Sequence, residues 1–249
     1  MDFFCKFGRN ISPLDKFKKN IYSQNGEDGV IHKLFQILKI KEKIWVCEFG
    51  AWDGVHLSNT FALVEIGAKA VYIEGDFDKY RDLLNTVKIH KNILPINSYV
   101  EFDGKNSLDA ILSQTKIPKN FDLLSIDIDS YDLDCWESLK KYTPKIVIIE
   151  INSSYPPGEF NRHNSPLAGN SFSSTLAVAK EKNYSLVAHI GNLVFIHNDY
   201  VKHLKYPSKF IKNPNLLFND FWINNKILFF IDWVLSGFIK VGKRLLKLR

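Results

Sequence analysis

The sequence predicts an α/β fold in which a seven-stranded, mostly parallel sheet carries helices on both faces. Three observations support this prediction. Short apolar runs alternate with helix-length segments, which is typical of parallel βαβ units. The 249 residues are 45% hydrophobic and 24% charged, which suits one such domain. Two strand-like runs flank Gly191-Asn192 and indicate a closing hairpin.

Five strands and five helices are expected before the hairpin. The strands are expected at 43–49, 70–76, 93–100, 121–129 and 145–152. The helices are expected at 57–67, 77–90, 107–114, 133–142 and 171–183. Gly50 ends the first strand and Gly67 the first helix, while Pro144 ends the fourth helix. Ser171 is placed to cap the fifth helix. Pro95 cannot donate to a ladder, so the third strand is expected at an edge of the sheet.

The last third of the domain adds a long loop and the hairpin. Residues 153–171 are rich in Pro, Gly, Asn and Ser, and loops of this length are usually functional or disordered. Residues 184–198 form the expected hairpin. Five parallel strands followed by a hairpin are the Rossmann-like architecture of class I methyltransferases, which use S-adenosylmethionine. We expect three segments: an N-terminal helical, cofactor-lid segment (1–40), the methyltransferase domain (41–200) and a basic amphipathic tail (201–249).

A glycine turn follows the first strand, in EFGAWDGVHLSNT (48–60). Gly50 and Gly54 allow a tight turn and a close approach to a ligand, and Glu48 and Asp53 bring carboxylates to the same rim. Glu74 ends the second strand, where an acid typically holds the ribose of an adenosine cofactor. A structural turn and an exposed loop acid are the alternatives. No phosphate-binding signature is present, which favours S-adenosylmethionine over a dinucleotide.

Two motifs carry a family resemblance. EFGAWDGVHLSNT with the following AVYIEGD, and the upstream YSQNGEDGVI (22–31), resemble the FkbM-like S-adenosylmethionine-dependent methyltransferases over roughly residues 22 to 200. The resemblance implies an O-methyltransferase that acts on sugars or natural products, often in polysaccharide pathways. It places four residues on the cofactor, Gly50, Asp53, Glu74 and Asp127, and two near it, Gln24 and Glu27. Trp52 departs from the small polar residue usual in the family.

Acidic side chains gather where the fourth and fifth strands end. Asp127, Asp129 and Asp132 follow the fourth strand, and Glu150 and Asn152 follow the fifth. Because adjacent parallel strands lie about 4.8 Å apart, these side chains can converge. Asp127, Asp129, Glu150 and Asn152 would suit Mg²⁺. Alternatively, Asp127 or Asp129 would act without a metal as the general base, and Asp132 would cap the next helix.

The long loop offers further candidates for substrate contacts. His163 is a second candidate base, although a lone loop histidine is more often solvated. Arg162 could hold a phosphate or carboxylate of the substrate. Tyr131 and Tyr155 could stack on a sugar ring, or could simply pack.

The positive charge of the chain lies in its tail. The net charge is +6, and the ten basic and two acidic residues from Lys202 to Arg249 leave −2 for the rest. Residues 221–249 are apolar except for a polar stripe at helical spacing, and the longest uncharged run is too short to span a bilayer. We expect an interfacial helix on anionic lipid; intramolecular packing or a homodimer interface is the alternative. The slightly acidic domain disfavours nucleic acid.

These features predict an S-adenosylmethionine-dependent O-methyltransferase of a sugar or glycan, in a cell-surface polysaccharide or a lipid-linked precursor. A nucleotide-dependent oxidoreductase and a non-catalytic membrane scaffold are the alternatives. The N-terminal MDFFCKFGRN lacks the apolar core of a signal peptide, and the three cysteines form no CxxC pair. We therefore expect a cytoplasmic protein, peripheral at the inner face of the membrane.

Overall fold

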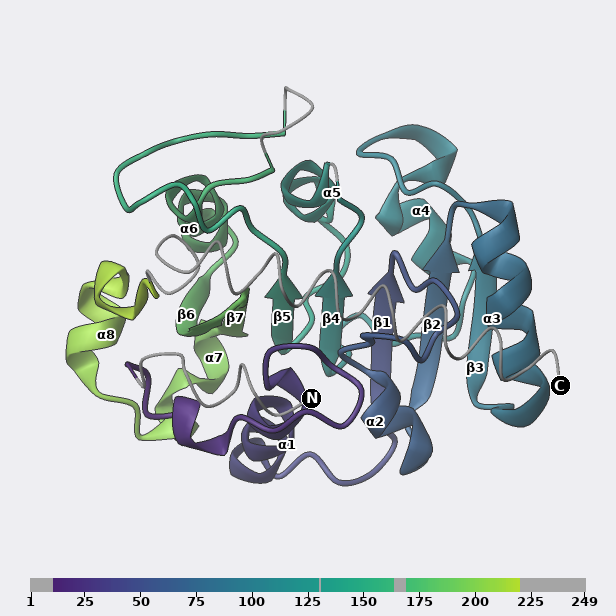
Figure 1. Ribbon diagram of the computed structural model, residues 1–249, viewed down its shortest axis with the longest axis horizontal. Coiled ribbons are helices and arrows are strands. Elements are labelled where there is room, and N and C mark those ends of the chain that lie inside the picture. Colours follow the sequence, from purple (N-terminus) through teal and green to yellow (C-terminus); the bar gives the residue numbers. More distant parts are fainter. Residues whose placement is uncertain (1–10, 130, 164–168, 220–249) are drawn as a thin grey trace, which may run out of the picture.

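The computed structural model describes residues 11–129, 131–163 and 169–219, and its centre is a seven-stranded sheet (Figure 1). The strands are β1 Trp45–Phe49, β2 Lys69–Glu74, β3 Ile93–Asn97, β4 Leu123–Ile126, β5 Ile146–Ile149, β6 Tyr184–Ile190 and β7 Asn192–His197. They lie in the order β3-β2-β1-β4-β5-β7-β6. The first five are parallel, and β7 is antiparallel to both β5 and β6. This is the Rossmann-like class I methyltransferase fold that the sequence predicts, with β3 at an edge.

Helices cover both faces of the sheet. They are α1 Glu27–Leu38, α2 Phe61–Glu65, α3 Phe77–Ile89, α4 Leu108–Ser113, α5 Asp132–Ser138, α6 Phe172–Glu181, α7 Asn198–Val201 and α8 Ser208–Lys212. One core packs the sheet against α4, α5 and α6, and the other packs it against α1, α2 and α3. Alternate residues of each strand pack into the two cores: Val147 of β5 packs into the first and Ile148 into the second.

This alternation determines where the acidic side chains point. Val46, Tyr72, Leu123 and Ile148 belong to the core on the α1 side. Glu48 and Glu74 lie two residues further along β1 and β2, and Asp127 and Glu150 directly follow the last residues of β4 and β5, so all four are in phase with that core. The acids at the carboxyl edge therefore face the side of the sheet covered by α1, α2 and α3.

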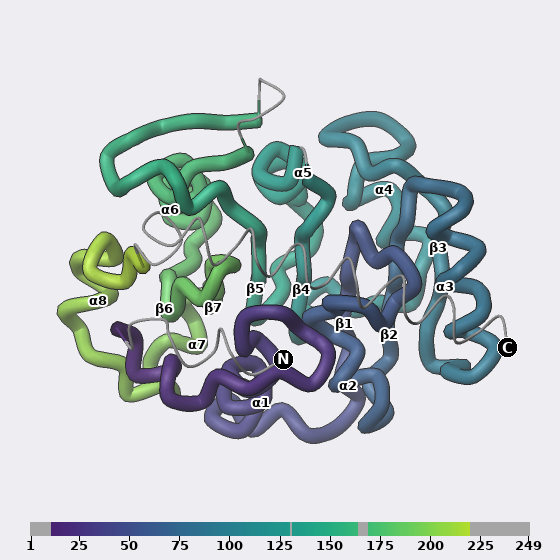
Figure 2. Tube along the Cα trace, in the orientation of Figure 1, coloured from purple at the N-terminus to yellow at the C-terminus, as the bar shows by residue number. Residues whose placement is uncertain are grey.

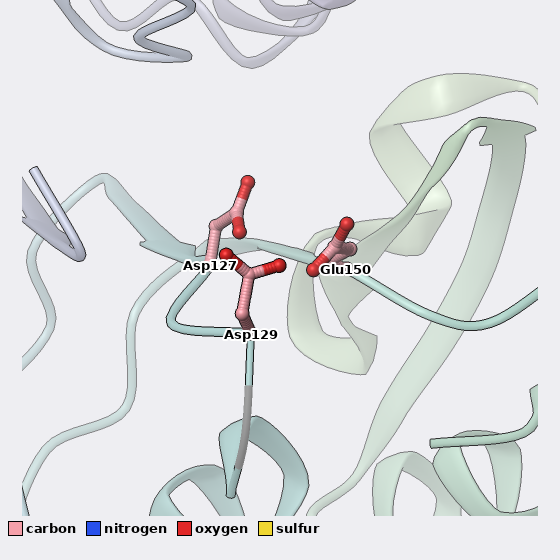
Figure 3. A group of neighbouring side chains, drawn as sticks. All are labelled: Asp127, Asp129 and Glu150. Carbon is pink, nitrogen blue, oxygen red and sulfur yellow. The ribbon is translucent and has the colours of Figure 1, made fainter. Parts of the chain in front are cut away.

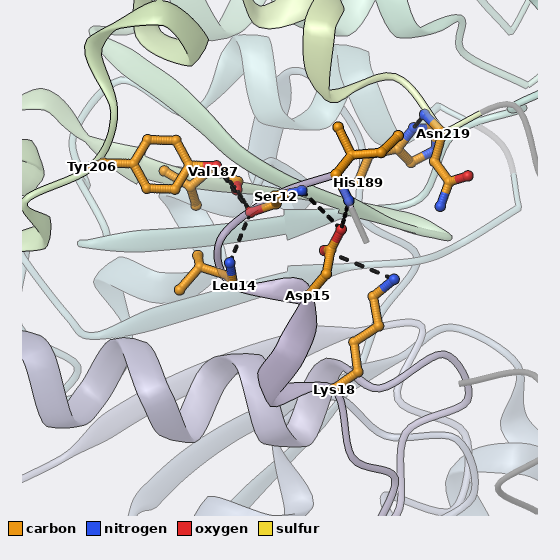
Figure 4. Close-up of polar contacts among 9 residues, drawn as sticks. Ser12, Leu14, Asp15, Lys18, Val187, His189, Tyr206 and Asn219 are labelled. Carbon is orange, nitrogen blue, oxygen red and sulfur yellow. Dashed lines mark hydrogen bonds and ion pairs between the residues drawn. The ribbon is translucent and has the colours of Figure 1, made fainter. Parts of the chain in front are cut away.

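The two ends of the described chain meet on β6 (Figures 2 and 4). Ser12 Oγ and the Tyr206 hydroxyl both donate to the carbonyl of Val187, at 2.6 and 2.5 Å. The backbone N–H of Asn219 donates to Nδ1 of His189 at 2.9 Å. Buried apolar residues Leu204, Phe210 and Leu217 join the cores of the sheet. The described residues after 200 thus pack on the sheet, and the three segments expected from the sequence stay a prediction.

Four helices begin elsewhere than the sequence predicts, and two of them, α4 at Leu108 and α6 at Phe172, begin only one residue late, after a serine N-cap. The helix expected from residue 57 begins at Phe61, because Ser58, Asn59 and Thr60 are bonded to a carboxylate described below. Helix α5 begins at Asp132, one residue early, and Tyr131 takes the N-cap position. No helix in the described part of the chain is long and apolar enough to cross a membrane. The predicted interfacial helix, residues 221–249, lies outside the described residues.

Candidate functional site at the carboxyl edge of the sheet

The glycine turn after β1 presses against the end of β4. Gly50 has φ +78°, and a Cβ at this position would lie 1.7 Å from the carbonyl oxygen of Asp127. Its N–H donates to the carbonyl of Ile73 in β2 at 3.1 Å. Only glycine tolerates both the left-handed backbone and this contact. Gly50 therefore fixes the distance between the turn and the loop that carries Asp127.

Glu74, at the end of β2, closes this turn from the other side. One of its oxygens accepts the N–H of Trp52 at 2.8 Å, and the other accepts the N–H of Asp76 at 2.8 Å. The carboxylate is buried. The ring of Tyr99 covers Gly75, where a Cβ would lie 2.5 Å from the ring. The ribose contact of Glu74 stays a prediction, and Tyr99 is an exposed aromatic at this rim that the sequence did not single out.

Asp53 and Gly54 shape the turn itself. Asp53 Oδ1 accepts the N–H groups of Val55 and His56, at 2.9 and 2.7 Å. A Cβ on Gly54 would meet the side chains of Leu83 and Tyr72, which are core residues. The glycine at position 54 is thus required by core packing, and the predicted cofactor contacts of both residues stay predictions.

Glu48 lies deeper, inside a buried polar network. Its carboxylate accepts hydrogen bonds from Ser58 Oγ at 2.6 Å, from Thr60 Oγ1 at 2.5 Å and from the N–H of Asn59 at 3.1 Å. Burial raises its pKa. These bonds use both oxygens to hold the segment before α2, which gives Glu48 a structural role. Contact of Glu48 with the cofactor stays a prediction.

Glu27 is fully buried at the start of α1, and it links the N-terminal segment to the hairpin. It accepts the N–H of Asn25 at 2.7 Å and the side-chain amide of Asn192 at 3.3 Å. Burial raises its pKa to about 7. Leu193 pairs with Ile149, so Asn192 lies one step further, beside the end of β5. Glu27 therefore lies near the carboxyl edge, whereas the side chain of Gln24 is exposed.

Three of the predicted acids converge at the ends of β4 and β5 (Figure 3). One carboxylate oxygen each from Asp127, Asp129 and Glu150 lies within 4.8 Å of the others. Burial and the charge of Glu150 raise the pKa of Asp127 well above its usual value. Burial and the charges of Asp129 and Asp132 raise the pKa of Glu150 to about 7. Both shifts favour a proton held between Asp127 and Glu150, as is usual for crowded carboxylates.

Three of the four predicted ligands of a divalent ion lie close together. The three carboxylates offer the oxygen ligands that Mg²⁺ prefers. The amide oxygen of Asn152 instead accepts hydrogen bonds from the N–H and Oγ of Ser154, at 3.0 and 2.5 Å. Asn152 thus closes its own turn, because the chain bends directly after β5. Binding of Mg²⁺ by Asp127, Asp129, Glu150 and Asn152 stays a prediction.

Ser153, in the loop after β5, is hydrogen-bonded to His189 of β6. The two residues do not form a nucleophile and a base. Ser153 Oγ lies 2.9 Å from Nε2 of the buried His189. Nδ1 of His189 accepts the N–H of Asn219, so the ring proton is on Nε2 and points to the serine. Burial lowers the pKa of His189 to about 3. The histidine therefore donates to Ser153 and holds the loop after β5 on β6.

Asp132 and Arg162 are the next predicted residues: the first belongs to α5 and the second contacts it. Asp132 accepts the N–H of Ile128 at 2.8 Å, so its carboxylate braces the β4–α5 loop. Arg162 forms ion pairs with Glu137 at 2.6 Å and with Asp134 at 3.9 Å, which ties the long loop to α5. The substrate contact of Arg162 stays a prediction.

His163 lies beside Tyr131. The centroids of the two rings are 5.2 Å apart, in an edge-to-face arrangement. The N–H of His163 donates to the side chain of Asn170 at 3.2 Å. Its predicted role as a base stays a prediction, and its observed partner is an aromatic ring.

Comparisons with known proteins find similar solved structures but no family. No family model matches the sequence, and no curated protein matches it. The N-terminal domain of EvdMO1, crystallised in the presence of SAH and D-fucose, is 13% identical over 70% of this chain and 83% of that chain, with a TM-score of 0.45. A SAM-dependent methyltransferase from Aquifex aeolicus is 16% identical over 75% and 96%, with a TM-score of 0.43. WbdD, crystallised with a kinase inhibitor, is 12% identical over 76% and 48%, with a TM-score of 0.48.

Proposed function

We propose that this protein is an S-adenosylmethionine-dependent O-methyltransferase that acts on a hydroxyl group of a sugar. The observation that carries the proposal is the acid pair of Asp127 and Glu150, which is held at the carboxyl edge of a class I methyltransferase fold directly beside the Gly50 turn. In open α/β sheets, ligands bind at this edge. The acid pair therefore lies where a reacting hydroxyl would be bound.

The residues at this edge fit S-adenosylmethionine better than a nucleotide. The described rim presents the carboxylates of Glu74, Asp127 and Glu150, which would repel a pyrophosphate and favour a positive sulfonium. The Gly50 turn, Glu74 and Asp127 would hold the cofactor. When bound, S-adenosylmethionine supplies an electrophilic methyl group, and its transfer leaves a neutral thioether.

The chain supplies the group that accepts the proton. A hydroxyl that attacks a methyl carbon forms a C–O bond and loses its proton, and a nearby base removes that proton. Glu150 suits this task because its pKa of about 7 leaves it deprotonated in much of the protein just above neutral pH while it remains a useful base. Asp127 shares the proton, and the exposed Asp129 is placed to accept hydrogen bonds from other hydroxyls of the acceptor.

The sugar acceptor and the cellular setting rest on the sequence. The segments 22–31 and 48–60 resemble FkbM-like enzymes, many of which methylate sugars. The basic, apolar residues 221–249 would hold the protein at the inner face of the membrane, where lipid-linked glycan precursors are made.

Calorimetry with S-adenosylmethionine, S-adenosylhomocysteine and NAD tests the proposal. We expect micromolar binding of the first two compounds and none of NAD. Binding of NAD alone would establish the oxidoreductase alternative, and binding of no compound would favour a non-catalytic scaffold. Transfer of a labelled methyl group to sugar acceptors then tests the reaction. Glu150→Gln should abolish transfer while the affinity for S-adenosylmethionine stays within a few-fold, whereas Glu42→Gln, an exposed loop substitution, should alter neither.

A further inference from the structure

Three aromatic rings from three different loops meet at Tyr131, which follows Asp129 of the acid group by two residues. The ring centroid of Tyr131 lies 6.0 Å from that of Phe102 and 5.2 Å from that of His163. Phe102 follows β3, Tyr131 follows β4 and His163 follows β5. In the sheet, β2 and β1 separate β3 from β4. The segment after β3 therefore crosses back over the carboxyl edge to bring Phe102 to Tyr131.

Two of these rings are open to solvent. Phe102 is 53% exposed and Tyr131 is 48% exposed, so they are packed against each other without being covered by the rest of the described chain. Rings that only fill the core become buried, as Trp136 and Phe121 are here. An exposed aromatic pair at the ligand-binding edge of the sheet instead offers a flat surface to a ligand.

The aromatic surface and the acid group are close in the sequence, because Tyr131 follows Asp129 by two residues. Asp129 has φ +56°, a left-handed conformation that costs an L-residue about 1 kcal/mol. This bend lets the Asp129 carboxylate join Asp127 and Glu150, while Tyr131, two residues later, reaches Phe102. Two residues span at most about 7 Å. The Cα atoms of Asp129 and Tyr131 are therefore at most about 7 Å apart, so the Asp129 carboxylate and the aromatic surface arise from neighbouring points of one loop.

We infer that Phe102, Tyr131 and His163 form the acceptor subsite and bind the pyranose ring of a sugar by stacking. A pyranose has a face of C–H groups, which suits the electron-rich face of an aromatic ring, and a rim of hydroxyls, which suits carboxylate acceptors. A planar phenol would use the rings but offers few hydroxyls to three acids. The Arg162 ion pairs to Glu137 and Asp134 hold the loop of His163 on α5. This inference rests on the proposed function and adds the location and chemistry of the acceptor site.

Saturation-transfer NMR on the full chain tests the subsite without requiring turnover. The probes are the methyl glycosides of mannose, galactose, glucose and fucose, and catechol is the planar alternative. We expect ring-proton signals from at least one glycoside with the wild type and with Tyr131→Phe, and loss of these signals with Tyr131→Ala. The matched control is Phe160→Ala, because Phe160 is a 73% exposed aromatic of the same long loop outside the ring group. Its signals should equal those of the wild type.

Kinetics supply the second readout. With the responding glycoside as acceptor, Tyr131→Ala and Phe102→Ala should raise the KM for the sugar by about 10-fold, while the Kd of S-adenosylmethionine changes by less than about twofold. Tyr131→Phe should stay near the wild type. An unchanged KM in Tyr131→Ala, signals from catechol alone, or no glycoside signal in the wild type would overturn the subsite. If S-adenosylmethionine does not bind, the proposed function fails, and the NMR result still decides whether sugars bind here.

Discussion

Replacement of Glu27 by Gln should make the protein more stable at alkaline pH. Glu27 is fully buried, and its pKa is raised from 4.5 to about 7 by burial. A carboxyl whose pKa is raised on folding contributes stability below its unfolded pKa, and this contribution is lost as the pH rises through the folded value. Glutamine has nearly the same shape and no charge at any pH, so the variant lacks this loss.

The size of the effect follows from the pKa values. The rise from 4.5 to about 7 corresponds to about 3.4 kcal/mol when the glutamate is deprotonated in both states. Between pH 5 and pH 8 the wild type should lose about 2.5 kcal/mol relative to E27Q, because part of the loss has already occurred at pH 5. The glutamine oxygen can still accept the Asn25 N–H, and Asn192 can rotate its amide to accept from the new NH₂ group.

Urea unfolding at several pH values measures this difference. The control is E42Q, which removes an equal charge from an exposed loop position, and its stability should follow that of the wild type within about 0.5 kcal/mol. If the stability difference between E27Q and the wild type is the same at pH 5 and pH 8, Glu27 does not titrate as its burial requires. That result would refute the reasoning.

Four further outcomes are expected. The free energy of unfolding, measured in urea, should be at least about 2 kcal/mol lower for Gly50→Ala than for Gly67→Ala. Both glycines have positive φ, but only a Cβ at Gly50 would meet a backbone oxygen. The rate of methyl transfer should rise as the pH passes about 7 and Glu150 deprotonates; a flat profile in the wild type would contradict its role as base. Exhaustive chelation should leave turnover intact if a proton alone reduces the repulsion between the carboxylates, whereas a loss of turnover that Mg²⁺ restores would establish a metal. Removal of residues 221–249 should release the protein from anionic liposomes with cofactor binding unchanged; continued sedimentation would exclude the tail as the anchor.

The order of the elements could be predicted from the sequence because the pattern is dense. Apolar runs of strand length alternate with helices, and Gly191-Asn192 marks the hairpin. The starts of the helices were less predictable. Helix α2 begins at Phe61 because Ser58 and Thr60 bind the carboxylate of Glu48, a long-range bond that local spacing does not reveal.

The acid group could be predicted only in part. The carboxyl ends of adjacent parallel strands meet, so the convergence of Asp127 and Glu150 follows from strand assignment alone. The hydrogen-bond partners of Asn152 and Arg162 could not be predicted from the strand assignment, because Asn152 binds within its own loop and Arg162 binds to α5. Phe102 was missed because its loop crosses two strands to reach Tyr131, and no local pattern encodes that crossing.

Carboxylates at the two ends of the sheet differ in whether they are paired with a cation, and this difference supports a function at the carboxyl edge. At the amino end, Asp122 is paired with Lys145 at 2.6 Å and accepts the N–H of Trp45. At the carboxyl end, no ion pair with a Lys or Arg within the described ranges reaches Asp127 or Glu150, and both have raised pKa values. Crowded acids without a cation destabilise the fold, and a shared proton only partly offsets this cost. A bound sulfonium or a reacting hydroxyl would relieve the same repulsion, so the destabilisation of the free protein becomes affinity for the ligand.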